Sequence, residues 1–100
     1  MKYYLYIIQT VSNTLYCGIA KDVLKRFHEH LYSKKGANYT KSHKPVDIVY
    51  IEEFEDKSSA LKEEYRIKKT LKRPQKLELI EAGREKTKKF LKNFHDTIDK

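Results

Sequence analysis

Three side chains in the first third of the chain could perform chemistry together: Tyr6, Tyr16 and Arg26. Tyr6 lies in the apolar run YYLYII, Tyr16 lies in a second apolar run that ends at Gly18, and Arg26 follows in a segment with helical spacing. Two strands and a helix can bring two phenols and a guanidinium into one site. We interpret such a site as one that cuts phosphodiester bonds. A tyrosine, with an ordinary pKa of about 10, is a poor base at neutral pH unless nearby positive charge lowers that pKa.

The two tyrosines need a β-hairpin to bring them together. Tyr3–Ile8 has apolar or amphipathic side chains on both faces, which is typical of a strand covered on two sides. The polar stretch after it predicts a turn, and Leu15–Ile19 predicts the returning strand. If the turn is Thr10–Ser12, Tyr6 lies directly opposite Tyr16 with the side chains in contact range. A slip of one residue in this register would separate the two rings.

A helix should carry the arginine. Asp22 predicts an N-cap, and the helix is expected to run to about Ser33. Val23, Leu24, Phe27 and Leu31 form its apolar stripe. Arg26 and His30 are four residues apart and fall along one border of that stripe, so they are neighbours on the helix surface. We therefore expect Arg26 at the edge of the core, close to the sheet.

A basic loop, KKGANYTKSHKP, spans Lys34–Pro45. It interleaves lysines with Tyr39 and small polar residues, as segments that grip a nucleic-acid backbone often do. Lys35, Tyr39 and Lys41 are the candidate contacts. On composition alone, an ordinary solvated connection is slightly favoured. A third strand is expected at Val46–Phe54.

The next helix should place a carboxylate next to the core. It is expected to begin at Asp56 to Ser59, with either Asp56 or Ser58 as its cap, and to end near Leu71. Glu64 projects from the middle of its apolar stripe, and Glu63 lies at the margin. An unpaired carboxylate on a core-facing stripe costs several kcal/mol unless a cation or hydrogen bonds compensate. A salt bridge to an arginine or lysine is the ordinary explanation. The residues of the inward stripe are expected to be Ala60, Leu61, Ile67 and Leu71.

The last quarter of the chain predicts more helix. Pro74–Glu81 should form a short helix that Gly83 ends. Arg84–Lys100 could be a terminal helix packed on the domain or a partly frayed tail. We expect one domain over residues 1–82 and an extension over residues 83–100.

Bulk composition favours an anionic partner. The 100 residues carry a formal charge of +8, with a pI near 9.5. This charge favours nucleic acid first and an anionic membrane surface second, although lysine-rich composition can also reflect solubility. Cys17 is the only cysteine, so an intrachain disulfide is excluded, and we expect it to pack as a small hydrophobe. The apolar run at Tyr3–Ile8 is too short for a signal peptide or a membrane span. We therefore expect a cytoplasmic protein with no membrane partner.

These residues resemble the GIY-YIG nuclease superfamily. The two signatures are Tyr4-Leu5-Tyr6 and Tyr16-Cys17-Gly18, followed by Arg26, His30 and, within ALKEEYRIK, Glu64. The loop KGANYTK and the run EYRIKKTLKR are similar to the small, stand-alone bacterial branch. The resemblance covers about three quarters of the chain. One tripeptide is weak evidence, but the ordered set with this spacing is specific.

The resemblance implies an α+β fold, a three-stranded antiparallel sheet flanked by helices, and one divalent metal used to hydrolyse DNA. In that case Glu64 would hold Mg²⁺ or Mn²⁺, and Arg26 would brace the transition state with its planar fork. Tyr16, with Tyr6 beside it, would position or deprotonate the attacking water. His30 is the alternative base or a positioning group. Further contacts to nucleic acid would come from Lys68, Lys72 and Arg73.

The sequence departs from the family pattern at two points, of which the first concerns packing and the second, together with the basic loop, leaves other functions open. Tyr4 stands where the first signature has glycine, and the asparagine that many members carry has no clear equivalent near Arg73–Lys76. The protein could therefore be a metal-dependent endonuclease acting on DNA, or a nucleic-acid-binding module of the same fold that cuts poorly. A third alternative is a subunit that is active only in a complex with a protein partner.

Overall fold

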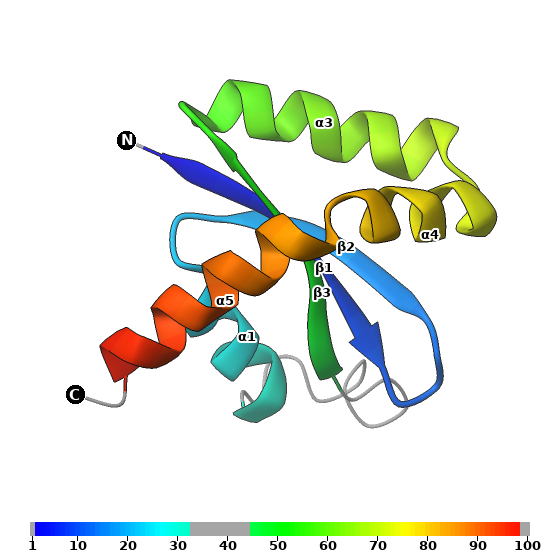
Figure 1. Cartoon of the computed structure of the whole chain (residues 1–100). Coiled ribbons are helices and arrows are strands. Elements are labelled where there is room, and N and C mark those ends of the chain that lie inside the picture. The colour runs from blue at the N-terminus through cyan, green and yellow to red at the C-terminus, as the bar shows by residue number, and fades with distance from the viewer. Residues whose placement is uncertain (1, 33–44, 99–100) are drawn as a thin grey trace.

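The computed structural model describes residues 2–32 and 45–98, and it forms a three-stranded antiparallel sheet with helices on both faces (Figure 1). The α+β fold expected from the sequence is confirmed. In chain order the elements are β1 (Tyr3–Thr10), β2 (Leu15–Ala20), α1 (Val23–Tyr32), β3 (Pro45–Phe54), α3 (Lys57–Thr70), α4 (Arg73–Ala82) and α5 (Arg84–Ile98).

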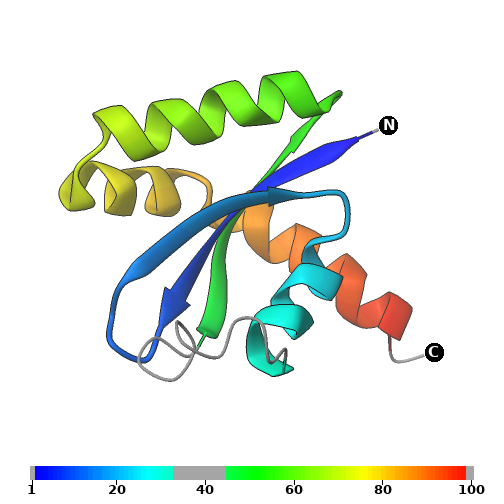
Figure 2. The same ribbon diagram turned by 180° about the vertical axis from the view of Figure 1, so that it is seen from behind.

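Strand β1 is the central strand, because the sheet order is β2-β1-β3. Its side chains alternate between two separate cores, which is why both of its faces are apolar. Leu5 and Ile7 pack beneath α3 and α4, whereas Tyr6 and Ile8 pack beneath α1 and α5. Figures 1 and 2 show these two helix pairs on opposite sides of the sheet.

The hairpin has a different register from the expected one. Thr10 N–H donates to the Thr14 carbonyl at 3.0 Å, and the loop between these residues is Val11–Asn13. Asn13 adopts a positive φ of 63°, a conformation that asparagine tolerates better than most residues. The turn therefore lies one position later than predicted, and every cross-strand pair shifts by two residues. Tyr6 is opposite Gly18 rather than Tyr16. A two-residue shift preserves the face, so both rings still point to the same side of the sheet.

The two predicted helix caps are confirmed. Asp22 Oδ1 accepts a hydrogen bond from the Lys25 N–H at 3.1 Å at the start of α1. Asp56 Oδ1 accepts one from the Ser59 N–H at 2.8 Å at the start of α3. The expected inward stripe of α3 is wrong at Leu61, which is 43% exposed. Ala60 and Ile67, which belong to the same predicted stripe, are fully buried as expected.

Helix α5, the last element of the chain, covers the core that contains Tyr6 and Ile8. The buried Thr87 hydroxyl accepts a hydrogen bond from the Ile51 N–H at 3.2 Å, which satisfies a donor on the β3 edge. The Phe90 ring meets the Tyr4 ring edge-on, with centroids 5.1 Å apart. Of the two alternatives for Arg84–Lys100, the described part is helical to Ile98. Within the described ranges, no helix is both long enough and apolar enough to cross a membrane.

Candidate active site

The pair of tyrosines lies beside the outer edge of the sheet. The centroids of the Tyr6 and Tyr16 rings are 6.4 Å apart, and the planes are tilted by 42°. The rings are diagonal neighbours across β1 and β2, since Tyr16 pairs with Ile8. The Tyr6 ring lies over Gly18, where a Cβ atom would come within 2.6 Å of the Tyr6 hydroxyl oxygen. The missing side chain of Gly18 therefore gives the Tyr6 phenol its place at the β2 edge.

The two phenols differ in exposure. Tyr6 is 2% exposed, and burial raises its pKa far above the ordinary value. The hydroxyl of Tyr6 is therefore neutral at physiological pH. Tyr16 is half-buried, so its ring is the more accessible of the two. Tyr16 therefore presents the more accessible phenol of the pair, and Tyr6 is the buried, neutral one.

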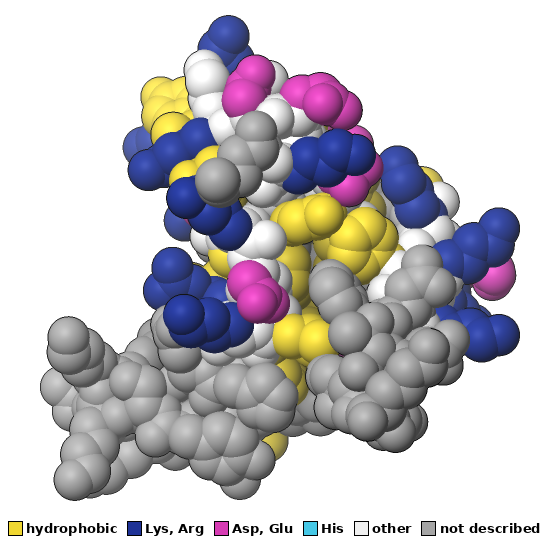
Figure 3. All heavy atoms as spheres, turned by 90° about the vertical axis from the view of Figure 1, so that its left-hand side faces the viewer, with side chains coloured by type: hydrophobic (Ala, Val, Ile, Leu, Met, Phe, Trp, Pro, Cys, Tyr) yellow, Lys and Arg dark blue, Asp and Glu magenta, His cyan; other side chains and the backbone are white. Residues whose placement is uncertain are grey.

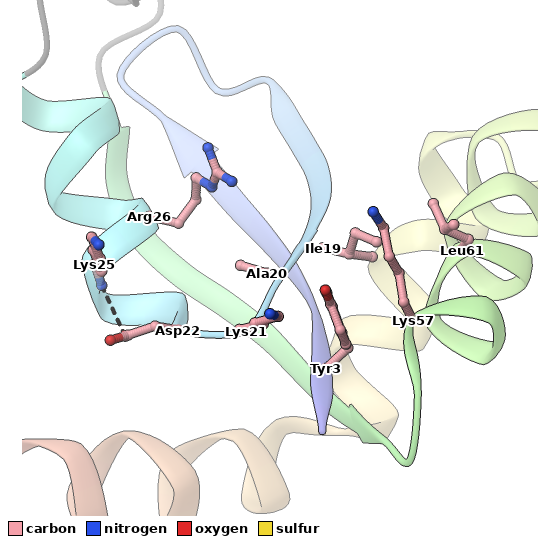
Figure 4. Close-up of a pocket in the computed structure, with 9 residues that line it drawn as sticks. All are labelled: Tyr3, Ile19, Ala20, Lys21, Asp22, Lys25, Arg26, Lys57 and Leu61. Atoms are coloured by element: carbon pink, nitrogen blue, oxygen red, sulfur yellow. Dashed lines mark hydrogen bonds between the residues drawn. The ribbon is translucent and has the colours of Figure 1, made fainter. Parts of the chain in front are cut away.

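Arg26 lies on α1 and faces a cleft of about 570 Å³ that opens between α1 and the start of α3 (Figure 4). In this close-up, β2 passes between the Arg26 side chain and Lys57. Arg26 is exposed, as expected for a residue at the border of the apolar stripe. The nine lining residues are Tyr3, Ile19, Ala20, Lys21, Asp22, Lys25, Arg26, Lys57 and Leu61.

Three lysines of this cleft were missed by the sequence analysis: Lys21, Lys25 and Lys57. Figure 3 shows Lys and Arg side chains above and below a hollow at the left of that view. Lys21 and Lys25 are four residues apart on either side of the α1 cap, which is the one local signal that could have found them. Lys57 is distant in sequence and joins them only through the packing of α3 against the sheet.

Glu64 occupies the middle of α3, as predicted, and its side chain is 19% exposed. Its Oε2 lies 3.5 Å from Lys68 Nζ, so one carboxylate oxygen forms the salt bridge that the ordinary explanation requires. Lys68 is half exposed, and such a pair is weak and easily rearranged. The neighbouring Glu63 is 22% exposed and binds Arg66 through both carboxylate oxygens. Of the two carboxylates, Glu64 has the looser partner.

The pKa of Tyr6 identifies the charges around it. After burial, the Tyr16 phenol raises this pKa, Arg26 lowers it, and Glu64 raises it by a smaller amount. The charges of Arg26 and Glu64 therefore both act on the Tyr6 hydroxyl, although α1 and α3 cover opposite faces of the sheet. Both helices contact β2, which is an edge strand. Tyr6 and Tyr16 lie on β1 and β2, and Arg26 and Glu64 lie on the two helices that contact β2.

The donor set fits a hard divalent cation only in part. No group of three His, Cys, Asp or Glu side chains that could hold a metal occurs among the described residues. Glu64 therefore offers a single carboxylate. Mg²⁺ is commonly held by one or two carboxylates together with waters and substrate phosphates, so one carboxylate is compatible with Mg²⁺ if a phosphate completes the shell.

The other predicted site residues fall into two groups. His30 belongs to α1, one turn after Arg26, but its side chain lies outside the described part, as do Lys35, Tyr39 and Lys41. Lys72 and Arg73 are exposed at the end of α3 remote from Lys57, roughly 20 Å along the helix. The structure does not bring them to the cleft.

Residues 2–78 match the GIY-YIG catalytic domain, and the chain belongs to this family. The UPF0213 protein SSP2268 of Staphylococcus saprophyticus is 49% identical over 82 residues, covering 82% of this chain and 98% of that protein. A UPF0213 protein of Syntrophus aciditrophicus is 42% identical, covering 85% and 97%. The solution structure of the UPF0213 protein BH0048 from Bacillus halodurans has a TM-score of 0.55 and 33% identity, covering 84% of this chain and 87% of that one. The fold and the nuclease superfamily are therefore established.

Proposed function

We propose that this protein is a metal-dependent endonuclease that hydrolyses phosphodiester bonds in DNA. The observation that carries the proposal is the contact between the Tyr6 and Tyr16 rings at β2, the strand that the helices bearing Arg26 and Glu64 both contact. The match to a catalytic domain of nucleases supports the same reaction class. Bacterial relatives share most of the chain, but their names assign no substrate.

Each side chain of the proposed site has a role that follows from its chemistry. Arg26 is always charged and planar, so it can hold two phosphate oxygens and stabilise the charge that develops on them. Tyr16 is accessible enough to orient a water molecule for in-line attack on phosphorus. Tyr6, kept neutral by burial, can only donate or accept a hydrogen bond at this pH. A deprotonated Tyr6 is therefore not the base, and His30 keeps the role of alternative base from the sequence analysis.

Glu64 is the residue that would hold Mg²⁺ or Mn²⁺, with Lys68 released from its carboxylate. A divalent ion there would neutralise phosphate charge and favour departure of the leaving oxygen. Lys68 would then be near the same phosphate, which agrees with its place among the expected nucleic-acid contacts. No other described carboxylate is required for this arrangement.

The test compares Glu64→Gln with Glu63→Gln in a nicking assay with Mg²⁺ or Mn²⁺. Both glutamates lie on α3 at similar exposure and both have a basic partner, so Glu63 is a matched control. We expect Glu64→Gln to lower the cleavage rate by about 100-fold or more, the scale of losing one charge-stabilising group. Glu63→Gln should cut normally. Equal activity of the two variants would refute the role of Glu64.

A second candidate function is a binding module that cuts DNA poorly. It is motivated by the ion pair between Glu64, the expected metal ligand, and Lys68. In this case the wild type would bind DNA but cut no duplex, single-stranded or branched substrate in either metal. Binding should also be insensitive to chelation and to Glu64→Gln. A partner-dependent nuclease would instead gain activity when purified with its partner.

A further inference from the structure

We propose that the cleft between α1 and α3 binds a phosphodiester group that neighbours the one being cut. The inference rests on the proposed nuclease function, and it extends the site from one phosphate to a length of strand. It assigns a role to Lys21, Lys25 and Lys57, for which neither the family signatures nor the sequence pattern provided one.

The charge of the cleft favours an anion. Lys21, Lys25, Arg26 and Lys57 line it, against a single carboxylate, Asp22. That carboxylate already has a backbone partner, because its Oδ1 accepts the hydrogen bond from the Lys25 N–H. A concave surface with cations on both walls concentrates field more than the same charges on a convex surface. Within the described residues, Lys21, Lys25 and Lys57 form no ion pair within 4 Å.

The shape and apolar parts of the cleft suit a nucleotide more than a bare ion. Tyr3, Ile19 and Leu61 supply apolar surface between the cations. Leu61 is 43% exposed, although its helix offers a core-facing side, so its exposure is otherwise unexplained. Lys21 Nζ lies 5.7 Å from the centroid of the Tyr3 ring, which holds the ammonium over the aromatic face. A sugar or base edge could pack on these side chains while its phosphate meets the lysines.

Arg26 connects the cleft to the reaction site. It lines the cleft, and its charge also acts on the Tyr6 hydroxyl. A strand lying along β2 would therefore place one phosphate at Arg26 and the tyrosines, and the next among the lysines. An acidic peptide would satisfy the charges but has no reason to continue toward two phenols. The observations thus favour nucleic acid over an acidic protein.

The experiment measures binding without chemistry. A short fluorescein-labelled DNA oligonucleotide is titrated with Lys25→Gln, Lys57→Gln and the wild type in EDTA, over a series of salt concentrations, by fluorescence anisotropy. The matched controls are Lys62→Gln on α3 and Lys88→Gln on α5, which are exposed lysines outside the cleft. Thermal unfolding of each variant establishes that it is folded.

The expected result is specific to the cleft lysines. Each cleft variant should bind more weakly and should reduce the slope of log K against log salt by about 1, irrespective of DNA sequence. The controls should keep the wild-type slope. Slopes that are unchanged in both cleft variants, or reduced equally in the controls, would overturn the proposal. Competition by a poly-glutamate peptide as effective as DNA would also overturn it, because the cleft would then be a general anion site.

Two failures can be told apart. If the wild type cuts DNA and the cleft variants cut it with unchanged KM, the nuclease proposal stands and the neighbouring phosphate site does not. If the wild type cuts no DNA but the cleft variants lose salt dependence as expected, the phosphate site stands and the nuclease proposal fails. A raised KM with an unchanged kcat in the cleft variants supports both.

Discussion

The Tyr6 ring lies so close to Gly18 that no other residue fits opposite it without moving the phenol. A Cβ atom at Gly18 would be 2.6 Å from the Tyr6 hydroxyl oxygen and 2.8 Å from the ring carbon that bears it. The ring is packed into the core behind, where Tyr6 is 2% exposed, so it has little room to retreat. The glycine of the second signature thus fixes the position of the tyrosine in the first.

Gly18→Ala should therefore damage both stability and activity. Overpacking of this kind costs about 1–3 kcal/mol of unfolding free energy, which urea denaturation would measure. The displaced phenol should lower the cleavage rate further than the loss of folded protein explains. Gly83→Ala is the control, because its Cβ would meet the Tyr50 ring at the same 2.6 Å distance outside the tyrosine pair. If both variants lose activity only in proportion to unfolding, Gly18 has no role beyond packing.

Arg26→Lys should separate charge from geometry. The variant keeps the positive charge but loses the planar fork that grips two phosphate oxygens. We expect DNA binding to change little and kcat to fall by about 10²–10³, the range for removing one group that stabilises the transition state. Arg84→Lys, at an exposed ion pair with Glu81, is the control and should be neutral. A variant that raised KM alone would limit Arg26 to substrate binding.

Alkaline pH should destabilise the fold. Burial raises the pKa of both Tyr6 and Tyr50 above the ordinary value, and Glu52 raises that of Tyr50 further through a hydrogen bond of 3.1 Å. In the unfolded chain both phenols lose their protons near pH 10. The folded state binds these protons more tightly, so their stabilisation is present below about pH 10 and is lost as the pH rises above it.

Urea denaturation at a series of pH values measures this effect. Tyr50→Phe should lose less stability than the wild type between neutral pH and pH values above about 10, because one titrating phenol is gone. Tyr65→Phe, on the exposed side of α3, should behave as the wild type. An alkaline loss that is identical in all three proteins would show that the buried phenols do not cause it.

The bond between α5 and the sheet can be tested with Thr87→Val. This substitution keeps the shape of the side chain but leaves the buried Ile51 N–H without its hydrogen-bond acceptor. We expect a loss of about 1–3 kcal/mol in the free energy of unfolding. Thr70→Val is the control, since its hydroxyl bonds to Arg66 on the exposed side of α3. A loss no larger than that of the control would mean that α5 contributes little through this contact.

The sequence by itself determined the features that depend on local chemistry. The caps at Asp22 and Asp56 are hydrogen bonds to a residue three positions away, so they can be read without knowing the fold. The two apolar faces of Tyr3–Ile8 required a central strand, which β1 is. The order of tyrosines, arginine and glutamate predicted the family.

Only the tertiary structure decided how distant segments meet. The hairpin register depends on the left-handed backbone at Asn13, which the polar pattern of Thr10 to Thr14 did not identify. The burial of Tyr6, which keeps its hydroxyl neutral, depends on packing beneath α1 and α5. Lys57 joins Lys21 and Lys25 in one cleft because α3 packs back against the sheet. Periodicity records which face of an element is apolar, but it does not record which element will cover that face.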